Sequence, residues 1–80
     1  MELTVGEKIM IYRRRAKISS RELGVRSGIN ASTIRAYESG KQRPELMNIL
    51  RISKVLNIRA KELMDTDMKQ LLRQVQEKNA

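Results

Sequence analysis

The 80-residue sequence contains no cysteine, histidine, tryptophan or phenylalanine. Without cysteine or histidine the chain cannot form a zinc finger, a thiol nucleophile or an imidazole general base, which excludes most familiar catalytic and metal sites. Tyr12 and Tyr37 are the only aromatic residues, too few to stack successive nucleic-acid bases. We therefore expect no enzyme activity, no metal and no cofactor.

Long hydrophobic runs are also absent. The longest are a few residues, such as Ile9 to Tyr12, whereas crossing a bilayer takes roughly 20 apolar residues. The N-terminus lacks the hydrophobic stretch of a signal peptide. We expect no contact with a membrane and a cytoplasmic location.

Basic residues outnumber acidic ones, 17 to 9, and the net charge is +8. The excess is uneven, because residues 1–43 carry a balance of +6 and residues 44–80 a balance of +2. A polyanionic partner should therefore meet the N-terminal half.

Capping residues predict a first helix that begins after Thr4 and runs to about residue 15. Thr4 and Glu7 have the spacing of a capping box, in which each side chain accepts from the other residue's backbone amide. Helical spacing predicts one buried stripe on this segment, made of Val5, Ile9, Tyr12 and Ala16.

Two shorter helices should follow. Ser19 or Ser20 can cap a helix that ends at Gly28, and Asn30 can cap another that ends at Gly40. This arrangement of helix, tight turn and helix is the layout in which the second helix enters the major groove of DNA.

Apolar periodicity predicts further helices in the C-terminal half. The fourth should end at Asn57, and a short fifth should span Ile58 to Met64 and be closed by Asp65. The apolar stripe of the fourth helix should consist of Leu46, Ile49, Leu50, Ser53 and Leu56. No alternation typical of β-strands competes, so the predicted class is all-α.

The last fifteen residues should form one more amphipathic helix, capped by Asp67. Its apolar stripe consists of Met68, Leu71, Leu72 and Val75. A stripe of this kind must be buried, either against the same subunit or in a symmetric dimer contact through paired helices.

Three runs of sequence carry a family resemblance: ISSRELG (18–24), SGINASTI (27–34) and YESGKQRP (37–44). They resemble the Cro/C1-type (Xre-like) helix-turn-helix of phage repressors and bacterial transcription regulators. The resemblance covers residues 4–64. It implies a five-helix lambda-repressor-like domain at 1–64, followed by a C-terminal helix at 65–80 that could serve dimerisation.

The resemblance also implies a function, namely sequence-specific binding of double-stranded DNA by a transcription regulator. The expected form is a repressor that binds a palindromic operator as a homodimer, with the third helix in the major groove. The residues expected to read bases are Ala31, Ser32 and Arg35. Those expected to hold phosphates are Ser20, Arg21, Asn30, Thr33, Lys41 and Arg43. Arg13 and Glu38 match positions that pair across the domain in this family.

The sequence departs from the family at two positions. Ser20 stands where many members carry Gln, and Gly24 stands where the second helix usually carries Ala. Glycine costs about 1 kcal/mol of helix propensity relative to alanine.

Several alternatives remain open at the level of sequence. Within the regulator class they are a phage or mobile-element repressor, a restriction-system controller and an antitoxin that represses its own operon. Outside it, the fold could serve as an antirepressor-like or antitoxin-like module for a regulatory protein partner. Asp65 and Asp67 are explained by helix capping and do not indicate an enzyme.

Overall fold

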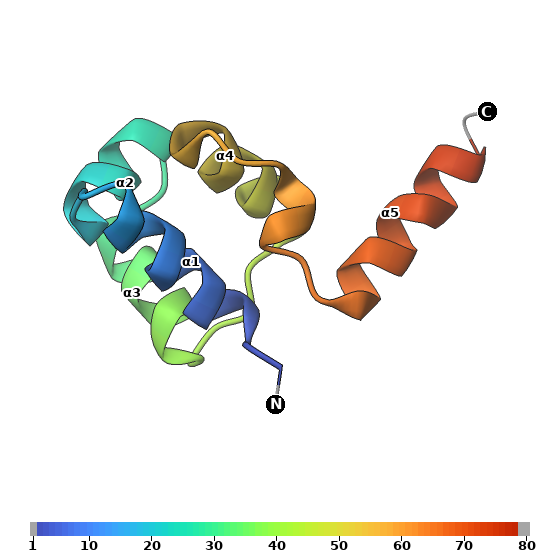
Figure 1. The fold of residues 1–80 in the computed structure, drawn as a ribbon, viewed down its shortest axis with the longest axis horizontal. Helices are drawn as coiled ribbons and strands as arrows, with labels where there is room; N and C mark the ends of the chain where they lie inside the picture. Colours follow the sequence, from blue (N-terminus) through green and yellow to red (C-terminus); the bar gives the residue numbers. More distant parts are fainter. Residues whose placement is uncertain (1, 79–80) are drawn as a thin grey trace.

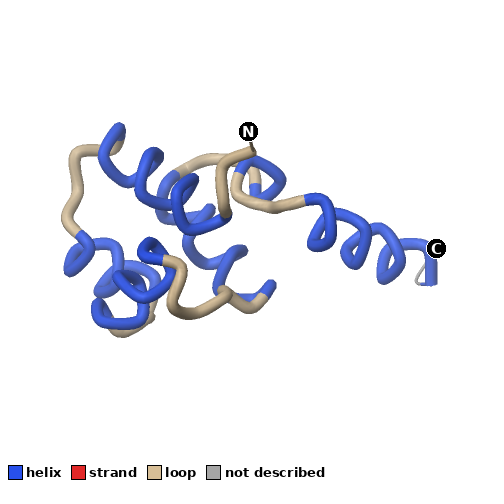
Figure 2. The backbone as a smooth tube through the Cα atoms, turned by 90° about the horizontal axis from the view of Figure 1, so that it is seen from below, coloured by secondary structure: helices blue, strands red, loops and turns tan. Residues whose placement is uncertain are grey.

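The computed structural model describes residues 2–78 as a helical body with one helix projecting from it (Figure 1). The elements are α1 (Val5–Arg15), α2 (Ser20–Ser27), α3 (Ala31–Ser39), α4 (Leu46–Leu56), the 3-10 helix η1 (Ala60–Glu62) and α5 (Thr66–Lys78). Within these residues there is no strand, which confirms the all-α prediction. In the same range no helix is both long and apolar enough to cross a membrane. Figure 2 shows α5 extending away from the other helices.

The N-terminal caps predicted for the first three helices are present. The Thr4 hydroxyl accepts from the Glu7 amide at 3.0 Å, and the Glu7 carboxylate accepts from the Thr4 amide at 2.9 Å. Ser19, not Ser20, caps α2 by accepting from the Glu22 amide. Asn30 caps α3. Each cap satisfies an amide that the first turn of a helix leaves without a partner.

The C-terminal ends predicted for the second, third and fourth helices are also confirmed. Gly28, Gly40 and Asn57 follow α2, α3 and α4 with φ angles of 73°, 82° and 57°, all in the left-handed region. Glycine and asparagine are the residues that adopt this conformation most readily.

Two boundary predictions were wrong. The helix expected over Ile58 to Met64 is reduced to the three residues of η1, and Leu63 and Met64, which follow η1, are both fully buried. The last helix begins at Thr66, and its cap is Asp65, whose carboxylate accepts from the Met68 amide at 2.9 Å. Asp67, expected as the cap, lies in the first turn.

The core lies where α1, α2, α3, α4 and η1 meet. Its largest fully buried side chains are Tyr37, Ile9, Leu23, Ile34, Ile49, Ile52, Leu63 and Met64. Ala16 and Leu50, expected in buried stripes, are exposed. Ala16 follows the last residue of α1, and Leu50 lies at the edge of an α4 face centred on Ile49 and Ile52.

Two glycines allow the backbone of α3 to lie very close to its neighbours. A Cβ atom built on Gly6 in α1 would lie 1.9 Å from the carbonyl oxygen of Tyr37 in α3. One built on Gly24 in α2 would lie 2.6 Å from the carbonyl oxygen of Ile29, just before α3. The departure from alanine at Gly24 therefore has a structural reason, since this turn leaves no room for a methyl group.

Gly6→Ala and Gly24→Ala should each lower the free energy of unfolding by about 1–3 kcal/mol, because overpacking against a backbone carbonyl outweighs the gain in helix propensity. Chemical denaturation monitored by circular dichroism measures the change. Val25→Ala, at a position in α2 that is 77% exposed, is the control and should shift the value by less than about 0.5 kcal/mol. Stabilisation by either glycine substitution would contradict the packing described here.

Candidate nucleic-acid interface

One face of α3 is anchored in the core and the opposite face is exposed. Ile34 is 0% and Tyr37 is 2% exposed, and the Tyr37 hydroxyl accepts from the Asn48 side chain of α4 at 2.8 Å. Ser32 and Arg35, three residues apart, are both exposed. Residues at this spacing share one side of a helix. The anchored face therefore fixes the direction in which the exposed one points.

The N-terminus of α3 is a small hydrogen-bonded unit. The Asn30 side-chain oxygen accepts from the Ser32 amide at 3.0 Å and from the Ser32 hydroxyl at 2.9 Å. The Ser32 hydroxyl thus donates its proton to Asn30, and its lone pairs stay free to accept a hydrogen bond from a ligand. The side-chain NH2 group of Asn30 stays free to donate. Ala31, next to them, is half-buried.

The residues expected to hold phosphates come from the start of α2, the start of α3 and the loop after α3. Arg21 and Lys41 are exposed, and neither forms an ion pair with any residue of the described range. Ser20 and Thr33 are half-buried. Ser20 and Arg21 open α2, where unpaired backbone amides and the helix dipole favour an anion.

Arg43 differs from this group because it has a carboxylate partner. It lies 2.8 Å from Asp65, whose other oxygen accepts from the Met68 amide. Burial raises the pKa of Asp65, but the bond from Met68 and the pair with Arg43 outweigh it, so the pKa lies below its ordinary value. The pair joins the loop after α3 to the start of α5, and nothing in the spacing of the two residues indicates it.

Arg13 and Glu38 form the most buried ion pair in the described chain, with side chains 12% and 9% exposed. The guanidinium donates to both carboxylate oxygens, at 2.7 and 2.9 Å, and to the carbonyl of Ile18 at 3.0 Å. The hydrogen bond to Glu38 raises the pKa of Arg13 above its ordinary value. The pair fastens α1 to the C-terminal turn of α3 and is not part of the exposed face.

The sequence profile of the helix-turn-helix family matches residues 9–63. This range contains α2, the turn at Gly28 and α3. The chain therefore belongs to the Cro/C1-type helix-turn-helix family and is a DNA-binding transcription regulator. No curated protein matches the sequence.

Solved structures give the same fold. The P22 c2 repressor in complex with synthetic operator 9T is 28% identical, with a TM-score of 0.74 over 80% of this chain and 97% of that one. The restriction-modification controller protein C.AhdI from Aeromonas hydrophila is also 28% identical, with a TM-score of 0.73 over 75% of this chain and 91% of that one. A chain of the SinR/SinI complex is 23% identical, with a TM-score of 0.72 over 91% of this chain and 79% of that one. At this identity the match supports the fold alone. The lambda-repressor-like fold is thereby confirmed.

Glu38→Ala should lower the free energy of unfolding by about 3 kcal/mol, because it leaves the Arg13 charge buried without a partner. The exposed pair Glu22 and Arg26, 3.7 Å apart, supplies the control: Glu22→Ala should cost about 0.5 kcal/mol or less. The double variant Arg13→Met/Glu38→Leu should recover part of the loss. Equal costs for Glu38→Ala and Glu22→Ala would contradict the role assigned to the buried pair.

Proposed function

We propose that this regulator is a repressor that binds a palindromic operator as a homodimer, with α3 of each subunit in the major groove. The observation that carries the proposal is the exposed face of Ser32 and Arg35 on a helix whose other face is anchored. The 28% identical P22 c2 repressor, solved with a synthetic operator, supports it. In this geometry the two half-sites are centred about 34–36 Å apart.

Sequence readout is assigned to Ala31, Ser32 and Arg35. Because the Ser32 hydroxyl already donates to Asn30, it is free to accept, which suits the amino group of adenine or cytosine. Arg35 can donate two hydrogen bonds to O6 and N7 of guanine. The methyl group of Ala31 suits contact with the methyl group of thymine.

Phosphate binding is assigned to residues around the start of α2, the start of α3 and the loop after α3. They are Ser20, Arg21, Asn30, Thr33, Lys41 and Arg43. The unused amide donors of Asn30 and the helix dipole both favour a phosphate there. Arg43 would exchange the Asp65 carboxylate for a phosphate oxygen.

We further assign residues 1–64 to DNA binding and 65–80 to dimerisation; of these, residues 1 and 79–80 lie outside the described residues. Met68 is buried and Leu72 packs against the core. Leu71 and Val75 are 52% and 45% exposed. This uncovered half of the α5 stripe suits pairing with the same stripe of a second copy.

Ser32→Ala and Arg35→Ala should change which sequences are bound, whereas Lys41→Ala should weaken binding to all sequences alike and reduce its salt dependence. Selection from a pool of random duplexes at near-physiological salt, followed by sequencing, measures preference. Arg51→Ala is the control, since Arg51 is an exposed arginine of α4 and should leave the selected motif unchanged. Recovery of no motif would contradict sequence-specific binding and favour the protein-binding alternative.

Leu71→Asp and Val75→Asp should each shift the protein from dimer to monomer, because a buried carboxylate at a symmetric contact has no partner. Sedimentation velocity over a range of concentrations measures the shift. The matched control, Val25→Asp, places the same charge at an exposed apolar position of α2 and should leave the dimer intact. A wild-type protein that stays monomeric on its selected duplex would refute the homodimer.

A further inference from the structure

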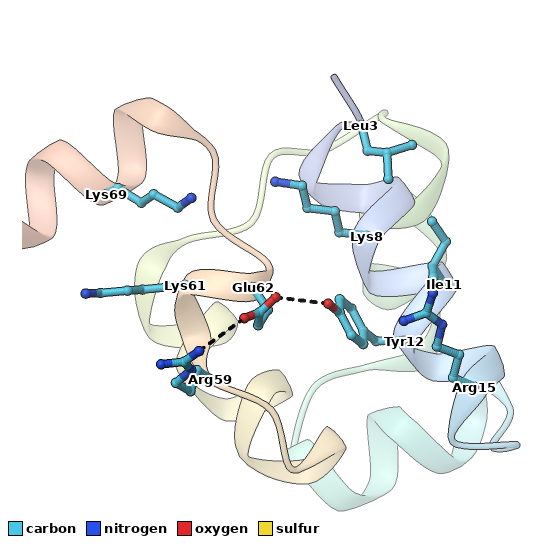
Figure 3. A pocket seen from close by; sticks show the side chains of 9 residues that line it. All are labelled: Leu3, Lys8, Ile11, Tyr12, Arg15, Arg59, Lys61, Glu62 and Lys69. Carbon is cyan, nitrogen blue, oxygen red and sulfur yellow. Dashed lines mark hydrogen bonds and ion pairs between the residues drawn. The ribbon is translucent and has the colours of Figure 1, made fainter. Parts of the chain in front are cut away.

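A cavity of about 530 Å³ opens between α1, η1 and α5 (Figure 3). None of its lining residues belongs to α2, to α3 or to the loop after α3. It is therefore separate from every residue assigned above to DNA. Its volume falls within the range of about 300–1,000 Å³ that is typical of small-molecule sites.

The lining of this cavity is strongly basic. It contains five cationic side chains, Lys8, Arg15, Arg59, Lys61 and Lys69, and one carboxylate, Glu62. Glu62 is already engaged, since it accepts from the Tyr12 hydroxyl at 3.1 Å and lies 3.8 Å from Arg59. Within the described residues, Arg15, Lys61 and Lys69 form no ion pair.

Two of the α1 cations are held in place, and within the described residues neither forms an ion pair, although Lys8 lies close enough to Asp65 to help lower the pKa of that carboxyl. Lys8 donates one hydrogen bond to the carbonyl of Met64 at 3.0 Å and keeps two further donors. The Arg15 guanidinium lies 5.4 Å from the centre of the Tyr12 ring, at a distance typical of a cation–π contact. The two cations are seven positions apart in sequence, which places them about 10 Å apart along the helix.

Helix α5 contributes Lys69 to the lining of the cavity. Figure 3 shows Lys69 reaching from this helix toward Lys8, and both residues also line a smaller hollow beside Asp65. Lys61 and Lys69 line another hollow beside Leu72. Lys8 and Lys69, like charges from two elements, repel one another where they line the same hollow, and an anion between them would convert this repulsion into attraction.

Apolar surface adjoins the cations. Leu3 is 47% exposed, and Ile11 lies one helical turn from both Lys8 and Arg15. A bare inorganic anion would leave this surface in water, whereas a ligand with an apolar portion would cover it.

We propose that the cavity between α1, η1 and α5 binds a small organic phosphate of nucleotide size, whose phosphates meet Lys8, Lys61 and Lys69 and whose apolar portion covers Leu3 and Ile11. Lysine is a common point-charge ligand of phosphates. Because Lys69 is the contribution of α5, the ligand would also hold this helix against the body of the protein.

Isothermal titration of the full chain with ATP, without divalent metal and at near-physiological salt, tests the proposal. Lys61→Ala/Lys69→Ala should weaken binding by about tenfold or more, since it removes two charge-assisted contacts. Arg51→Ala/Lys54→Ala removes the same charge from exposed positions of α4 that line none of the cavities described here. This matched double variant should change the affinity by less than about twofold.

Equal weakening by the two double variants would overturn the site, because it would mean that ATP senses only the net charge. Absence of ATP binding to the wild type would overturn it as well. Tripolyphosphate is the second probe and should bind more weakly than ATP. Equal binding of the two would overturn the assignment to an organic phosphate. These outcomes leave DNA binding untouched, because no substituted residue belongs to the surface assigned to DNA.

Discussion

The close approach of the α3 backbone to α1 and α2 is the constraint on which the rest of the structure depends. At Gly6 and Gly24 the neighbouring carbonyl oxygens lie where a methyl group would otherwise be. Arg13 and Glu38 then fasten the far end of the same helix with a buried, two-point ion pair. With one face fixed at three places, α3 can present Ser32 and Arg35 in a single direction. This rigidity is what a helix needs to meet base edges in register.

Helix starts and stops could be predicted from the sequence because they depend on local hydrogen bonds and on left-handed φ angles. Thr4, Ser19 and Asn30 satisfy amides two or three residues ahead, and Gly28 and Gly40 end helices by their own conformation. Where the extent of a helix depends on tertiary packing, the sequence predicted it less well. The 58–64 segment has the periodicity of a helix, yet only Ala60–Glu62 form a helical turn there, and Leu63 and Met64 pack into the core after it.

In the candidate site, too, features set by local sequence could be predicted, and features set by tertiary packing could not. The exposed face of α3 follows from its buried face, which the sequence contains as apolar spacing. The pairing of Arg43 with Asp65 does not, because it joins residues distant in sequence whose meeting depends on the path of the whole chain. The cavity between α1, η1 and α5 could not be predicted either. Its cations come from α1, from η1 and the residue before it, and from α5, and no local motif links them. Such features arise from tertiary structure alone.

In the proposed complex, the start of α3 meets the bases while the loop after α3 and the start of α2 meet the DNA backbone. Amide chemical-shift mapping of ¹⁵N-labelled protein, titrated with its selected duplex at near-physiological salt, tests this claim most directly. We predict that the largest shifts fall on residues 20–21, 30–35 and 41–43, and that residues lining the cavity under α5 shift little. Largest shifts on α1, η1 and α5, or small shifts spread over all basic residues, would contradict the account.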